Sequence, residues 1–402
     1  MKYDNLLRYA VRVVDAYSGE KPLHIWLKDF FRANPQMGSR DRKLVSEMVY
    51  CFYRMGHALK GISAEECIQA GLFLCNEGPV EALGYLKPEW NEAAGKTIEE
   101  KIGILKERYP DFSAEQIFPF GNLLSEGVDH AAYCLSFLKK PELFIRVRKG
   151  KEEITGAKLR EHKIAFSEPE PDSRLLFKAY SFANGTRLDE VLDLNREAVV
   201  QDLSSQKTGS LMKLPEADPE RAIRAWDCCA ASGGKSILLA DLYPMLELTV
   251  SDIRKTILEN LRKRFAEAGI KQYRAFQIDL TRQADIPGES FDLILADLPC
   301  TGSGTWSRTP ESLYFFDPGT LGNYSGRQKI ILSNIAGNLN AGGVLVYITC
   351  SVFAAENEEV VRALEANGEL QMVGRQVITG YADRADSMFA AVFRKISYGS
   401  PY

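Results

Sequence analysis

The feature that most constrains the fold is an alternation of strand-like and helix-like runs over the second half of the chain. From about residue 197, apolar runs such as LELTVSD (246–252) and FDLILAD (291–297) alternate with amphipathic runs. One of these, IRKTILENLRKRFAEAG (253–269), ends in a glycine typical of a helix C-terminus. Strands that alternate with helices predict an α/β fold with a mostly parallel, doubly wound sheet. Ligands of such sheets bind beyond the C-terminal ends of the strands, so functional residues are expected in those loops.

The first part of the chain has a different pattern. Residues 1–125 show apolar residues at helical spacing and no strand-like alternation, which predicts an all-helical domain. One of its runs is SRDRKLVSEMVYCFYRM (39–55), with Ser39 as the predicted N-cap. Residues 126–195 mix short strands, among them KIAF (163–166), with short helices and predict a small α/β module. The remaining residues, 196–402, form the third predicted domain.

The charge of the chain narrows its possible partners. The net charge is −4, so any contact with nucleic acid requires a local basic surface. The run LFIRVRKGK (143–151) brings Arg146, Arg148, Lys149 and Lys151 close together. This run is either a solvated strand face or a surface that contacts phosphates.

Targeting and metal-binding signals are missing from the sequence. The N-terminal run MKYDNLLRYAVRVVD lacks the apolar core of a signal peptide, and no stretch of about 18 apolar residues occurs. We therefore expect a cytoplasmic protein that does not contact a membrane. The eight cysteines form no C-x-x-C pair, which argues against a zinc site, and we expect free thiols. Four of them are predicted to be buried as small apolar residues: Cys51, Cys67, Cys75 and Cys134.

A small-residue loop, WDCCAASGGKS (226–236), joins a predicted strand to a helix. It is not a P-loop, because Cys229 stands where that motif needs glycine, and it is not a G-x-G-x-x-G dinucleotide loop. Alone it could be a structural turn. Asp252 and Asp279 end the next two strands, where each could cap a helix or bind a nucleoside. Together the three loops predict one adenosyl cofactor, S-adenosylmethionine, since no phosphate-binding pattern is complete.

Two cysteines follow strands of the same predicted sheet. Cys300 ends DLPC (297–300) and Cys350 lies in TCS (349–351). A thiolate that adds to C6 of cytosine makes C5 nucleophilic enough to take a methyl group, after which the C5 proton and the thiol leave. An acid such as Asp297 would stabilise the activated ring through its N3/N4 edge. The residues alone leave open which thiol attacks.

These motifs together resemble the RNA cytosine-5 methyltransferases of the Nop/Sun type. The resemblance rests on VVQDLSSQ (199–206), DCCAASGGK (227–235), DLPCTGSGTWSRTPE (297–311) and YITCSVFAAENEEVV (347–361). Residues 1–125 resemble the helical NusB-type domain found in bacterial 16S ribosomal RNA members. Residues 126–195 look like the RNA-binding extension of the family. The resemblance implies a Rossmann-like methyltransferase domain, an RNA substrate, rRNA processing and 5-methylcytosine as the product.

The resemblance also assigns roles to residues. It implies that Cys350 attacks C6, that Cys300 helps to release the product, that Asp297 holds the base and that Lys235 assists. The implied cofactor contacts are Cys229, Ala230, Ala231, Ser232, Gly233, Gly234, Lys235, Asp252, Arg254, Asp279 and Asp297. The family usually has proline at Ser232 and serine at Thr301.

Several alternatives stay open from the sequence. Trp306 and Arg308 either contact RNA or serve the loop structurally. Ribosomal RNA is the favoured substrate and transfer RNA the alternative. A ribosome-assembly factor that has lost catalysis is a rival, which the intact thiols, Asp297 and the glycine loop argue against. A methyltransferase acting on proteins or small molecules is another rival, which the thiol pair and the basic run argue against. We expect a monomer.

Overall fold

The computed structural model describes residues 2–214 and 221–396. They divide into two compact units. The first comprises residues 1–124, 128–141 and 305–318, and the second comprises residues 125–127, 142–304 and 319–402. None of the helices within the described ranges is long and apolar enough to cross a membrane.

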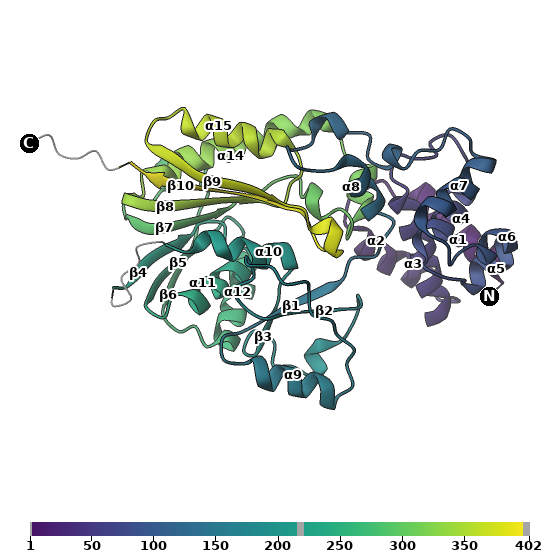
Figure 1. The fold of residues 1–402 in the computed structure, drawn as a ribbon, viewed down its shortest axis with the longest axis horizontal. Helices are drawn as coiled ribbons and strands as arrows, with labels where there is room; N and C mark the ends of the chain where they lie inside the picture. Colours follow the sequence, from purple (N-terminus) through teal and green to yellow (C-terminus); the bar gives the residue numbers. More distant parts are fainter. Residues whose placement is uncertain (1, 215–220, 397–402) are drawn as a thin grey trace, which may run out of the picture. The chain divides into compact units, whose positions relative to one another are not determined.

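The first unit is helical (Figure 1). Helix α1 buries one apolar face, with Leu6, Leu7, Ala10 and Val13, whereas α4 is buried on all sides from Cys67 to Cys75. The predicted N-cap of α3 is wrong by one residue. Gly38 is the extended residue before the helix, and its N–H donates to the Asp41 carboxylate over 3.3 Å. The helices are α1 (Tyr3–Ala16), α2 (Leu23–Ala33), α3 (Ser39–Arg54), α4 (Ala64–Cys75), α5 (Glu81–Leu86), α6 (Pro88–Glu92), α7 (Ile98–Arg108), α8 (His130–Ser136) and α13 (Pro310–Tyr314).

Residues 305–318 belong to this helical unit although they lie far along the sequence. Leu313 on α13 is fully buried, and its carbonyl oxygen lies 3.1 Å from Nε2 of His57. The Tyr314 ring stacks on the His57 ring. Trp306 is 3% exposed and packs against Phe118 and Phe316. The idea that Trp306 stacks on RNA is therefore wrong, because its ring is part of the core of this unit.

The second unit contains a seven-stranded sheet in the order β6-β5-β4-β7-β8-β10-β9. Along this order, β6, β5, β4, β7 and β8 pair in parallel. Strand β10 pairs antiparallel with β8 and β9. This confirms the predicted α/β fold with a mostly parallel sheet. The strands are β4 (Ile223–Asp227), β5 (Leu246–Asp252), β6 (Tyr273–Gln277), β7 (Phe291–Asp297), β8 (Leu339–Thr349), β9 (Leu370–Ile378) and β10 (Met388–Lys395).

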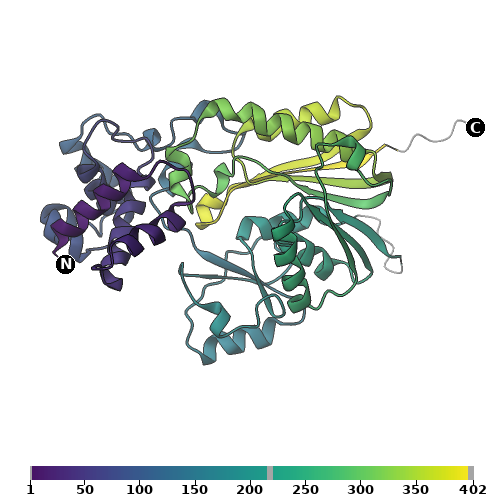
Figure 2. The same cartoon turned by 180° about the vertical axis from the view of Figure 1, so that it is seen from behind.

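Helices cover both faces of this sheet (Figures 1 and 2). Helices α14 (Leu321–Ala336) and α15 (Glu358–Glu365) pack on one face, in a core that includes Trp226 and Phe389. Helices α11 (Gly234–Leu242) and α12 (Lys255–Ala268) pack on the other face. Cys228 is fully buried in the core, as expected for strand packing.

A second, three-stranded sheet in the order β2-β1-β3 is also part of this unit. Its strands are β1 (Leu143–Val147), β2 (Ala179–Phe182) and β3 (Ala198–Val200), and α9 (Glu152–Glu161) packs on it through Leu159. The predicted strand 163–166 is wrong, because only an isolated bridge from Ser167 to Ser181 forms there. The short α10 (Leu203–Lys207) leads from this module toward the large sheet.

Candidate active site

A cavity of about 420 Å³ opens at the C-terminal ends of the parallel strands. This is the edge at which doubly wound sheets bind ligands. Eight of the predicted site residues line it: Cys229, Ala231, Asp252, Arg254, Asp279, Asp297, Cys300 and Cys350. Its wall is completed by Cys228, Ile253, Ile278, Leu280, Leu298, Pro299, Arg327 and Ile331. The volume and the mixed apolar and acidic lining suit a small organic ligand.

The glycine loop closes one side of this cavity. Gly233 has a φ of +83° directly before α11, and a Cβ there would lie 2.6 Å from the Phe265 ring. Ala231 adopts a φ of +46°, and its N–H donates to Oδ2 of Asp252 over 3.1 Å. Ser232, where the family usually has proline, accepts a 2.7 Å hydrogen bond from Arg264. The loop is thus held from several sides in a conformation that side chains rarely adopt.

The two acids that follow β5 and β6 serve their own loops and also face the cavity. Asp252 accepts from the N–H of Arg254 over 2.9 Å and pairs with the Arg254 guanidinium. Asp279 accepts from the N–H and the hydroxyl of Thr281, and these bonds lower the pKa of its carboxyl group. Asp252 and Asp279 therefore each cap their own loop and also line the cavity.

The two thiols meet in the cavity. Cys300 follows β7, Cys350 follows β8, and their sulfurs lie 3.4 Å apart. The strands are parallel neighbours, with Asp297 opposite Ile348, so the loops leave the sheet side by side. The pKa of the Cys300 thiol is well above its ordinary value because of its hydrogen bond to Cys350, its burial and the nearby charge of Glu356.

An ion pair lies beside the thiols. The Lys235 ammonium group donates to Oδ2 of Asp297 over 2.6 Å. Burial lowers the pKa of Lys235, but Asp297 and the nearby Cys350 and Asp227 raise it more, so the net shift is upward. The site therefore holds a firmly protonated cation close to Cys350.

Two features of the site were missed from the sequence. Asp227, at the end of β4, is fully buried and accepts a 2.5 Å hydrogen bond from Ser236, and burial raises its pKa to about 7. Glu356 is also fully buried and bonds to the residues that follow both thiols. The sequence signal that could have identified Glu356 is the polar run ENE (356–358). It entered the sequence analysis only as part of the family resemblance over residues 347–361.

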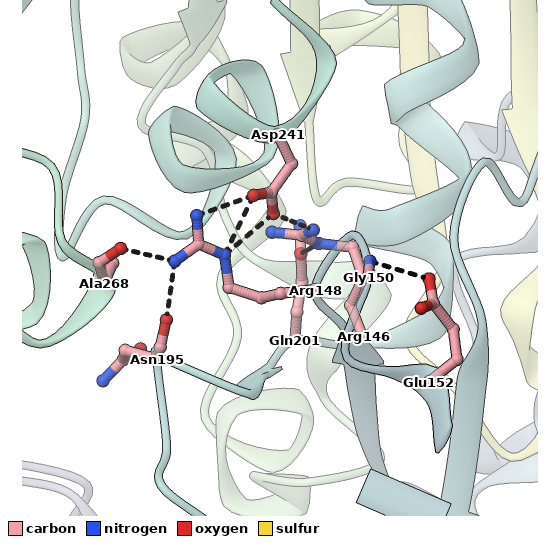
Figure 3. A network of polar contacts seen from close by, with 8 residues as sticks. All are labelled: Arg146, Arg148, Gly150, Glu152, Asn195, Gln201, Asp241 and Ala268. Atoms are coloured by element: carbon pink, nitrogen blue, oxygen red, sulfur yellow. Dashed lines mark hydrogen bonds and ion pairs between the residues drawn. The ribbon is translucent and has the colours of Figure 1, made fainter. Parts of the chain in front are cut away.

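The basic run at 143–151 does not form the phosphate-contact surface considered from the sequence. Arg146 and Arg148 point inward and converge on the Asp241 carboxylate of α11 (Figure 3). Their side chains are 1% and 14% exposed, and Arg148 also donates to the carbonyls of Asn195 and Ala268. These two arginines therefore hold the three-stranded module to α11 on the seven-stranded sheet. The exposed residues of this run are Lys149, Gly150 and Lys151.

Among residues 2–214 and 221–396, no group of three or more histidine, cysteine, aspartate and glutamate side chains could hold a metal ion. All eight cysteines are free thiols. The four predicted to be buried, Cys51, Cys67, Cys75 and Cys134, are buried.

Comparison with known proteins shows what the second half of the chain is similar to. Residues 215–388 match the family model described as 16S rRNA methyltransferase RsmB/F. The ribosomal RNA small subunit methyltransferase B of Xylella fastidiosa is 31% identical over 217 residues, which cover 50% of this chain and 49% of that protein. The probable ribosomal RNA small subunit methyltransferase B of Bacillus subtilis is 32% identical over 40% of this chain and 37% of that protein. The chain spans about half the length of the curated relatives it matches.

Solved structures show the same fold. The crystal structure of PH0851 superimposes with a TM-score of 0.69 at 19% identity and covers 98% of this chain and 99% of that one. NSun6 from Pyrococcus horikoshii, determined with SFG, gives a TM-score of 0.56 at 17% identity over 69% of this chain and 96% of that one. Residues 215–388 are therefore similar in sequence to the 16S rRNA methyltransferase RsmB/F family, and the solved structures show that the chain shares their fold.

Proposed function

We propose that this protein methylates C5 of cytosine in RNA, with 16S ribosomal RNA as the substrate. The observation that carries the proposal is the contact between the two sulfurs, Cys300 and Cys350, in a cavity also lined by Asp297, whose carboxylate pairs with Lys235. Methylation of a ring carbon needs a nucleophile that adds to the ring and later leaves. Amine methylation needs no thiol, so a thiol pair favours the C5 reaction.

S-adenosylmethionine is the methyl donor. The cavity suits it, because the Asp252 and Asp279 carboxylates can accept from ribose and adenine while apolar side chains such as Ile253 and Ile331 border the ring position. SFG, which is bound in the archaeal NSun6 structure, is an analogue of this cofactor. The cofactor supplies an electrophilic methyl group when bound, and the residues of the chain do the rest.

The residues divide the work as follows. The Cys350 sulfur bonds to C6, and the electron pair displaced from the C5–C6 double bond makes C5 nucleophilic. After C5 takes the methyl group, a base removes the C5 proton, the double bond reforms and the Cys350–C6 bond breaks. The Lys235 ammonium group lies near Cys350, and a cation beside a thiol suits a nucleophile, which supports this choice. Cys300 assists release, and Asp297 holds the base edge.

Adduct trapping tests the proposal. Wild type, Cys300→Ala and Cys350→Ala are each incubated with cellular RNA and S-adenosylmethionine, and RNA bound to denatured protein is sequenced. We expect only Cys300→Ala to trap RNA, because it can attack but not release, and we expect 16S ribosomal RNA in the adduct. Trapping by Cys350→Ala would reverse the roles, and trapped transfer RNA would change the substrate. No trapping and no methyl transfer by wild type would favour the assembly-factor alternative.

A further inference from the structure

The carboxylate of Glu356 is the point at which both thiol loops are fastened. It lies in a 3-10 turn, Ala354–Glu356, just after β8, and its side chain is fully buried. Oε1 accepts from the N–H of Thr301 over 2.8 Å, and Oε2 accepts from the Thr301 hydroxyl over 2.6 Å. Oε2 also accepts from the Ser351 hydroxyl over 2.5 Å. Thr301 and Ser351 directly follow Cys300 and Cys350, so one carboxylate holds both sulfur-bearing loops.

Glu356 is itself fixed by its surroundings. The Tyr347 hydroxyl donates to its carbonyl oxygen over 2.5 Å, and Gln328 Nε2 approaches Oε1 at 3.4 Å. The next residue, Asn357, accepts from the Thr349 hydroxyl over 2.6 Å and donates to the Ser351 carbonyl over 2.9 Å. A buried carboxylate with this many donors is held in one place and keeps its hydrogen-bonding capacity satisfied.

The two sulfurs have different electrostatic surroundings. The side chains that act on Cys300 are Cys350 and Glu356. Cys350 instead lies within the influence of the Lys235 ammonium group, which is paired with Asp297. A negative charge lies on the Cys300 side and a positive charge on the Cys350 side. A thiol near a carboxylate keeps its proton, which agrees with the raised pKa of the Cys300 thiol.

We propose that Glu356 is the positioning residue of the thiol pair: its carboxylate sets the separation of the two loops and places a negative charge beside Cys300. Glu356 does not line the cavity, and it acts through Thr301 and Ser351. The inference deepens the proposed function and rests on it for the kinetic consequence. Its electrostatic part can be measured without RNA or methyl transfer.

The experiment compares Glu356→Gln with Glu358→Gln in the full chain. Glu358 is a matched control, because it is buried two residues away and accepts from Ser125, which lies on neither thiol loop. Iodoacetamide labelling of each cysteine is followed by peptide mass spectrometry across pH. The pH of half-maximal Cys300 labelling should fall by about 1 unit in Glu356→Gln, since a neighbouring negative charge is removed. It should stay unchanged in Glu358→Gln. An unchanged Cys300 curve in folded Glu356→Gln would overturn the proposal.

Steady-state methylation supplies the second readout. Glu356→Gln should lower kcat about 100-fold through misplacement of the thiols. KM for RNA should stay within about twofold, because Glu356 makes no uniform binding contact. A raised KM with unchanged kcat would overturn the positioning role. If wild type itself transfers no methyl group while the Cys300 labelling shift is seen, the proposed function fails and the positioning of the thiols stands.

A second variant covers the case in which Glu356→Gln does not fold. Glu356→Asp keeps the charge but is one methylene shorter, so it cannot reach both loops. We expect its kcat to fall while its Cys300 labelling curve stays at the wild-type pH. A wild-type kcat, or a labelling curve that moves, would contradict the proposal.

Discussion

Asp227 is a carboxyl group that the fold buries with only one of its oxygens satisfied. Oδ2 accepts from Ser236, whereas Oδ1 has no hydrogen-bond partner among the described residues. Burial raises the pKa to about 7, so the folded state favours the protonated form. This contribution to stability is fully present below about pH 4, the ordinary pKa of aspartate, and is lost as the pH rises to about 7.

Asp227→Asn should therefore remove a pH dependence of stability. Between pH 4 and 7 the wild type should lose up to about 1.4 kcal/mol of unfolding free energy per pH unit relative to the variant. Urea unfolding midpoints at pH 5 and pH 7.5 measure this difference. Asp285→Asn, at an exposed position, is the control and should follow the wild type. If Asp227→Asn follows the wild type as well, Asp227 is already ionised at pH 5.

Substitution of Gly304 is expected to lower activity strongly, because its backbone contacts the backbones of Cys350 and Ser387. Its N–H donates to the carbonyl of Cys350 over 2.9 Å, and its carbonyl accepts from Ser387 N–H over 2.8 Å. A Cβ would lie 1.9 Å from the Ser387 carbonyl oxygen. Gly304→Ala should thus push the two thiol loops apart and lower kcat by about 100-fold. Gly326→Ala, which meets nothing within 4 Å on α14, should be neutral or stabilise by roughly 0.5–1 kcal/mol.

At the scale of elements, Asp241 connects α11 to β1. Asp241→Asn would leave the buried Arg146 and Arg148 guanidinium groups without their counter-charge, which typically costs about 3–5 kcal/mol. The paired variant Lys149→Ala/Lys151→Ala changes only exposed positions and should keep the wild-type melting temperature. If these lysines contact phosphates, its RNA affinity should have a salt slope lower by roughly 0.7 per lost contact. Equal melting temperatures for all three proteins would contradict the structural role of the arginines.

The same elements show which structural features the sequence predicts. Strands β5 and β7 were predicted from their apolar runs, since central strands of a parallel sheet are buried on both faces. Strand β9 was missed, because it is an edge strand whose residues alternate between exposed and half-buried. The burial of Arg146 was not predicted from the sequence either. A basic residue on a strand usually faces water, and its partner Asp241 lies 95 residues away.

The candidate site likewise contains residues that the sequence predicts and residues that it does not. Cys300, Cys350, Asp252 and Asp279 could be found because each directly follows a predicted strand, and parallel strands end at a common edge. Glu356 could not be found this way. Its importance comes from donors on two separate loops, and the distance between such donors is a property of the folded chain. Local pattern therefore predicts where the site lies, and tertiary contacts decide which residues hold it together.

At the scale of the whole molecule, the chain passes directly from the Cys300 loop into residues that complete the helical unit. Gly304 belongs to the sheet-containing unit and residue 305 to the helical one. Leu313 is fully buried on α13, and a Cβ on Gly56, just beyond α3, would lie 3.0 Å from its Cδ2. The helical unit is therefore built from two parts of the chain that lie far apart in the sequence, residues 1–124 with 128–141 and residues 305–318. Its stability should depend on a segment that lies between β7 and α14.

Leu313→Ala tests this dependence. Removing the buried side chain should destabilise the helical unit by about 2–5 kcal/mol. Hydrogen exchange followed by mass spectrometry should show faster exchange in α3 and α4 and little change in β4 and β7, although Leu313 follows β7 in sequence. Leu345→Ala, in the core of the sheet, should give the opposite pattern. Faster exchange confined to the sheet in Leu313→Ala would mean that residues 305–318 stabilise the catalytic loops and leave the helical unit independent of them. Faster exchange in α3 would show that the helical unit lacks part of its core until residues 305–318 are in place.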